Sequence, residues 1–75
     1  MVGYPKKFIG EHYSEEGGPL EIDSIICIGE RDEAIKRVES MTGGKVILEA
    51  RFFTVIQYEK SKKVSNRVIL FEFNE

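Results

Sequence analysis

Residues 45–59 read KVILEARFFTVIQYE, and residues 64–73 read VSNRVILFEF. In the first stretch apolar and polar residues alternate, the period of two that is typical of a strand with one buried face. The polar residues 60–63, KSKK, predict the turn that joins the two stretches. Residues 68–71, VILF, are apolar on both faces, which favours a central place in a sheet. These stretches predict a long C-terminal hairpin whose return strand lies in the interior.

The segment before the hairpin, residues 30–42, reads ERDEAIKRVESMT and predicts a helix. Its apolar residues recur along one stripe with helical spacing, at Ala34, Ile35, Val38 and Met41. Acidic residues crowd the first turn, where the helix dipole favours anions. Gly43 or Gly44 can take the left-handed conformation that ends a helix.

Two further strands precede the helix in the predicted fold. Leu20–Ile28 alternates as a strand, and Lys6–Tyr13 is expected to form a shorter one. The fold class is therefore α+β, in the order β(β)αββ, with one helix packed across one face of an antiparallel sheet of three to four strands. The expected sheet order is 6–13, 20–28, 64–73, 45–59.

Composition limits the class of protein. Seventy-five residues form a single domain, 1–75, and 41% apolar with 32% charged residues is typical of a chain that folds in water. No apolar run approaches the ~20 residues of a transmembrane helix, and no apolar segment follows the first lysines as in a signal peptide. We therefore expect no membrane association and a cytoplasmic location. A chain this short buries little surface and gains little stability from it, and small proteins often offset this by oligomerisation.

One helix can cover only one face of the sheet, which leaves apolar residues on the other. Depending on the register, these are Phe53, Val55, Ile25 and Cys27 or their neighbours in sequence. Contiguous exposed apolar surface usually marks a partner interface. The alternative is that the N-terminal segment folds over this face with its apolar side chains, Tyr4, Phe8, Ile9 and Tyr13. The sequence leaves both alternatives open.

Signals for chemistry are few. His12 stands among acidic residues in 10–16, GEHYSEE, which we interpret as a solvated acidic turn rather than a catalytic triad or a metal site. Cys27 is expected to be a small buried apolar residue. Gly43 and Gly44 follow a helix rather than precede one, so they form no phosphate cradle. The sequence predicts no catalytic residue, no metal ligand and no cofactor.

The leading hypothesis is a non-enzymatic protein-interaction module, regulatory or inhibitor-like, that works as a homodimer with an unidentified protein partner. It would act through the apolar sheet face or through 45–59 as an edge strand, and the predicted interface residues are Ile47, Arg51, Phe53 and Val55. The alternative is nucleic-acid binding by the basic hairpin tip, through Lys60, Lys62, Lys63 and Arg67. A second alternative is a small-ligand site between the subunits of an oligomer.

Overall fold

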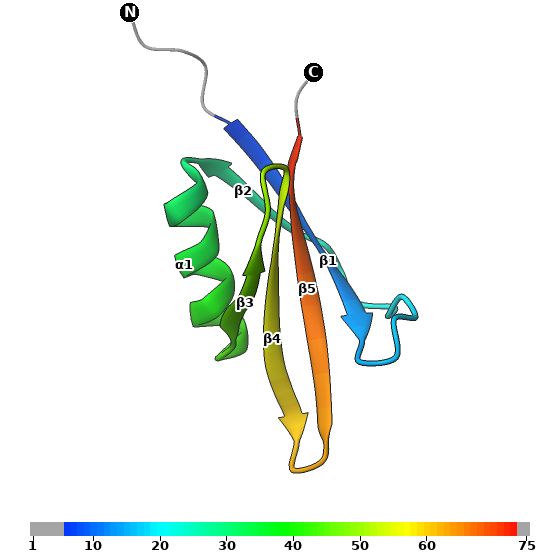
Figure 1. The fold of residues 1–75 in the computed structure, drawn as a ribbon. Helices are drawn as coiled ribbons and strands as arrows, with labels where there is room; N and C mark the ends of the chain where they lie inside the picture. Colours follow the sequence, from blue (N-terminus) through cyan, green and yellow to red (C-terminus); the bar gives the residue numbers. More distant parts are fainter. Residues whose placement is uncertain (1–5, 74–75) are drawn as a thin grey trace, which may run out of the picture.

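The computed structural model describes residues 6–73. Its elements are β1 (Lys6–Ser14), β2 (Ile25–Gly29), α1 (Arg31–Thr42), β3 (Lys45–Glu49), β4 (Phe53–Ser61) and β5 (Val64–Phe73). The strands form one antiparallel sheet in the order β2-β1-β5-β4-β3, with α1 against one face (Figure 1). The α+β class is confirmed. The predicted strand number was too low, because the sheet has five strands rather than three or four.

Helix α1 occupies the predicted segment, and local signals explain both of its ends. The backbone N–H of Glu30 donates to the Glu33 carboxylate at 3.3 Å, one half of a capping box that fixes the first turn. Gly43 follows the last turn with φ of 74°, and its N–H donates to the carbonyl of Glu39 at 2.7 Å. A side chain at Gly43 would be strained in this conformation, so glycine stops the helix here.

The hydrophobic core lies between α1 and the sheet. Alternate residues of the strands meet the apolar stripe of the helix in one cluster: Phe8, Ile25, Cys27, Ala34, Ile35, Val38, Ile56, Val68 and Leu70. Val46 and Tyr58 pack against its margin. Ala34, Ile35 and Val38 of the predicted helical stripe are in this core, whereas Met41 is exposed. The core uses one face of the sheet only.

The prediction of one long strand over 45–59 is wrong, because this segment forms two strands, β3 and β4, with a tight turn between them. The backbone N–H of Ala50 donates to the carbonyl of Phe53 at 2.8 Å and closes the turn. A bulge also shifts the register of β3, where Val46 pairs with Ile56 but Leu48 pairs with Val55. One extra residue moves every later side chain to the opposite face, so Leu48 does not share the face of Val46.

The predicted order of the strands is also wrong at the N-terminal side. β1 lies between β2 and β5, and it pairs with β5 from Lys7 opposite Phe73 to Ser14 opposite Asn66. β2 is an edge strand of five residues, whereas β1 has nine and is paired along both sides. The longer strand takes the interior position, where more backbone groups are satisfied. β5 is central, as predicted.

Candidate binding surface

The face of the sheet opposite α1, which we call the open face, is not covered by any part of residues 6–73. Strand register assigns its side chains, because residues paired across neighbouring strands point to the same side. They are Lys7, Ile9, Glu11 and Tyr13 of β1, Ile26 and Ile28 of β2, Lys45 and Leu48 of β3, Phe53, Val55, Gln57 and Glu59 of β4, and Ser65, Arg67, Ile69, Phe71 and Phe73 of β5.

The apolar residues of the open face form one continuous area, the apolar patch: Ile9, Ile26, Ile28, Leu48, Phe53, Val55, Ile69, Phe71 and Phe73. Ile28 is 70% exposed and Ile26 is 53% exposed on the edge strand. In the middle of the patch Val55 is only 8% exposed, although it is no part of the cluster under the helix. Its apolar neighbours on the open face shield it, so the patch is already partly packed within one chain.

Charged residues of both signs border the apolar patch. Lys7 lies over the ring of Phe73 at 5.5 Å from its centroid. Glu11 accepts a hydrogen bond of 2.5 Å from the Ser24 hydroxyl. The Nε of Arg67 is buried and has no hydrogen-bond partner within residues 6–73. An unpaired donor at such a position costs free energy.

The structure brings some of the predicted interface residues together and separates others. Phe53 and Val55 lie side by side along β4 in the apolar patch. Ile47 is the extra residue of the β3 bulge at the edge of the sheet, and it is exposed. Arg51 lies in the exposed turn between β3 and β4, over the ring of Phe52 at 5.2 Å. Because 45–59 is not one strand, it is not the long edge that the sequence predicted.

Sequence reasoning left open which alternate residues of 25–28 lie on this surface. Ile26 and Ile28 face the open side, whereas Ile25 and Cys27 are buried beneath α1. Residues 25–28 are apolar on both faces, so their alternation carries no information about which side the helix covers. The part of the N-terminal segment that the structure describes, from Lys6 onward, does not fold over the sheet. Its strand is part of the sheet, with Phe8 in the core and Ile9 in the patch, while Tyr4 lies outside the described residues.

The basic tip of the hairpin is a separate feature. Lys62 and Lys63 form the turn between β4 and β5, and Lys60 lies just before it; all three are exposed. The hairpin extends past the end of α1 (Figure 1). Arg67 does not belong to this tip, because its half-buried side chain lies on the open face. The four predicted nucleic-acid contacts therefore divide into a lysine tip and one arginine on the sheet.

His12 is not the solvated residue that its acidic neighbours predicted. It is buried in β1 on the helix side of the sheet, and its Nδ1 lies 3.1 Å from the hydroxyl of Tyr58. Asn66 donates to the same hydroxyl from β5 at 3.5 Å. Alternation explains the burial, since His12 follows Phe8 and Gly10 on the inward side of β1. The three side chains satisfy each other as a polar cluster inside the domain.

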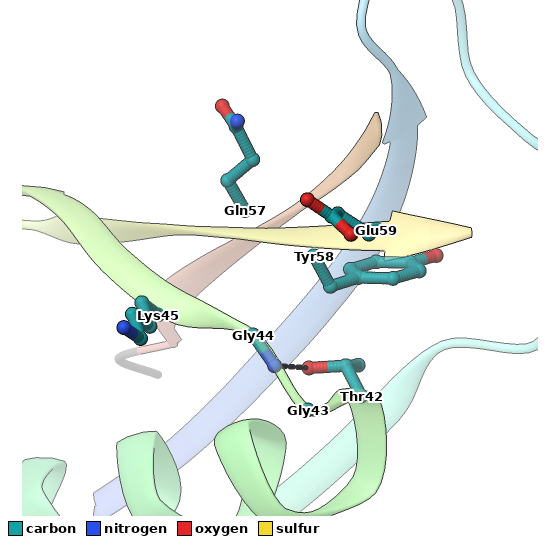
Figure 2. A pocket seen from close by; sticks show the side chains of 7 residues that line it. All are labelled: Thr42, Gly43, Gly44, Lys45, Gln57, Tyr58 and Glu59. Carbon is teal, nitrogen blue, oxygen red and sulfur yellow. Dashed lines mark hydrogen bonds between the residues drawn. The ribbon is translucent and has the colours of Figure 1, made fainter. Parts of the chain in front are cut away.

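A shallow hollow of about 420 Å³ lies beside this cluster, between the end of α1 and β4. Figure 2 shows its lining, Thr42, Gly43, Gly44, Lys45, Gln57, Tyr58 and Glu59. The backbone N–H of Gly44 donates to Thr42 Oγ1 at 3.1 Å, while Gln57 and Glu59 extend from β4 on the side opposite Tyr58. The polar side chains diverge, so the hollow lacks the convergent groups of a specific ligand site.

The remaining chemistry of the described residues is limited. Burial raises the pKa of the Cys27 thiol above its ordinary value, and the charge of Arg37 partly opposes this. No group of three or more histidine, cysteine, aspartate or glutamate side chains within 6–73 is arranged to hold a metal ion. In that same range, the single helix is neither long nor apolar enough to cross a membrane.

Comparison with known proteins identified no match among family models, curated proteins or solved structures.

Proposed function

We propose that this chain is a non-enzymatic binding module whose open face binds a polypeptide surface rich in apolar side chains. The apolar patch is the observation that supports the proposal. It crosses the whole sheet, from Ile28 on β2 to Leu48 on β3, and its edge-strand residues are more than half exposed. Proteins that act alone rarely expose contiguous apolar areas of this kind.

The shape of the patch favours a polypeptide over a small molecule. Small-molecule sites are concave and enclose most of their ligand, whereas this surface is one face of a sheet. Its side chains are aliphatic and aromatic, with charges only at the border, which resembles the apolar core and polar rim of protein interfaces.

The experiment compares what the tagged chain captures from cells that also express an untagged copy of it. The test variant is Phe71→Lys, which places a charge in the patch. The matched control is Met41→Lys, which places the same charge on α1 at a residue that is 60% exposed. We expect the parent and Met41→Lys to retain polypeptides after nuclease treatment, and Phe71→Lys to lose them while its circular dichroism spectrum is unchanged. Capture that is equal in all three proteins would contradict the proposal.

A second candidate function is nucleic-acid binding by the lysine tip. Lys60, Lys62 and Lys63 are exposed on a hairpin that extends beyond the helix, and lysines in such a position can contact phosphates. The double variant Lys62→Glu, Lys63→Glu should then lose retention on single- or double-stranded DNA and on RNA at low salt. Retention that is the same in parent and variant, or absent in the parent, rules this function out.

A further inference from the structure

We propose that the polypeptide bound by the open face is a second copy of this chain, with the two sheets packed face to face about a two-fold axis. This inference rests on the proposed function and names its partner. In a two-fold interface both subunits use the same surface, so each apolar patch would be covered by the other. The supporting observations are the area of the patch, the mixed charge around it and the state of the sheet edges.

The area of the patch suits a dimer. Large apolar side chains present about 150–250 Å² each, so the exposed parts of the patch amount to roughly 600 Å². A stable interface of standard size buries about 800 Å² per partner, of which about 60% is apolar. One patch therefore supplies the apolar area that one subunit of a stable dimer needs.

The charges of the open face match a copy of the same face. Lys7, Lys45 and Arg67 outnumber Glu11 and Glu59 by only one, so neither a strongly acidic nor a strongly basic partner is favoured. A second copy brings two carboxylates on the facing surface.

The edges of the sheet argue against pairing strand to strand. β2 and β3 are only five residues long. A bulge at Ile47 interrupts β3, and β2 leads within two residues into α1. Short and bulged edge strands are the devices that proteins use to prevent pairing with another chain. Edge pairing would also leave the apolar patch exposed.

Light scattering after size exclusion tests the inference on the parent, Phe71→Lys and Met41→Lys over a wide concentration range. We expect about twice the chain mass of 8.6 kDa for the parent and for Met41→Lys. Phe71→Lys should be monomeric, with its dissociation constant raised at least ~100-fold. Ile28→Lys is the second test variant. Its side chain is already 70% exposed, so the change hardly affects the fold of one subunit.

The outcomes separate this inference from the proposed function. If the parent stays monomeric at every concentration yet captures another protein through the open face, the proposal that the partner is a second copy is overturned. The proposal that the chain is a binding module then stands. A monomer that captures no polypeptide overturns both. Equal dimerisation of the parent, Phe71→Lys and Ile28→Lys would place the contact elsewhere. Dimer-dependent protection of β3 amides from hydrogen exchange would show edge pairing and would also overturn the face-to-face arrangement.

Discussion

Phe53 and Phe71 lie opposite each other on β4 and β5, with ring centroids 6.4 Å apart and ring planes inclined by 45°. This tilted pair lies in the apolar patch and joins two neighbouring strands on the side that α1 does not cover. It belongs to the fold of a single subunit and to the proposed interface. Its two roles can be measured separately.

The aromatic pair should show coupling within one subunit. In an Ile28→Lys background, which should remove self-association, we expect Phe53→Ala and Phe71→Ala to be non-additive by about 0.5–1.5 kcal/mol in the free energy of unfolding. Urea denaturation of the four proteins of the cycle measures this. Additivity within about 0.3 kcal/mol would mean that the two rings do not interact.

Gly44 is the most crowded glycine of the described chain. A Cβ at this position would lie 2.6 Å from the carbonyl oxygen of Gln57 and 2.9 Å from Tyr58 Cβ. Gly44→Ala should therefore lower the free energy of unfolding by about 1–3 kcal/mol, because β3 must move away from β4. The control is Gly18→Ala, where the nearest atom is Ser14 Oγ at 3.7 Å and a change within about 0.5 kcal/mol is expected. Thermal or urea unfolding of both variants measures these changes in the free energy of unfolding.

The hydroxyl of Tyr58 serves two buried polar residues, His12 and Asn66. Tyr58→Phe leaves both without this partner and should cost about 1–3 kcal/mol in the free energy of unfolding. Tyr13→Phe is the matched control, because the Tyr13 hydroxyl makes no hydrogen bond within residues 6–73. Equal stability of the two variants would show that the cluster contributes nothing.

Arg31 connects the start of α1 with the turn between β3 and β4. Its guanidinium donates to the carbonyl of Ala50 at 2.9 Å and to that of Arg51, and it lies 3.7 Å from the Glu72 carboxylate. A lysine cannot reproduce this fork, so Arg31→Lys should cost about 1–2 kcal/mol and speed hydrogen exchange in residues 50–52. Arg37→Lys makes the same change at an exposed position of α1 and should leave that exchange unaltered.

The thiol of Cys27 gives a prediction for alkaline pH. Burial raises its pKa in the folded chain, so the unfolded chain loses its proton first. The contribution of the protonated thiol to the free energy of unfolding should be complete below the ordinary thiol pKa. It should be lost as pH rises through the higher pKa of the folded chain. Cys27→Ala should show a smaller alkaline decline than the parent in urea titrations between neutral and alkaline pH. Identical declines would indicate that Cys27 does not cause the effect.

The sequence could predict features that depend on residues close together in the chain, and not those that depend on distant ones. Helix α1 was predicted within one residue of its observed start, because its stripe, its acidic first turn and Gly43 are local signals. The turn at 50–52 was missed because ARF contains neither glycine nor proline and continues the alternation of its neighbours. The place of β1 between β2 and β5 depends on pairing across most of the chain, and no local pattern records it.

The same division between local and distant interactions applies to the candidate surface. The sequence named Phe53 and Val55 as candidates for the uncovered face but left the register open, and the structure places both on that face. For residues 25–28 both registers remained open, and contact with α1 decides between them. The strand breaks at 47 and at 50–52 explain why Ile47 and Arg51 lie outside the apolar patch.

The pairing of β1 with β5 also has a consequence for synthesis on the ribosome. The first described strand has no partner on its inner side until the last one, Val64–Phe73, has been made. Until then β1 and β2 form only a two-stranded hairpin with α1 against it, and most of the sheet is missing. Contacts between such distant segments also slow folding. Most of the sheet would therefore form in one late step, after β5 has been made.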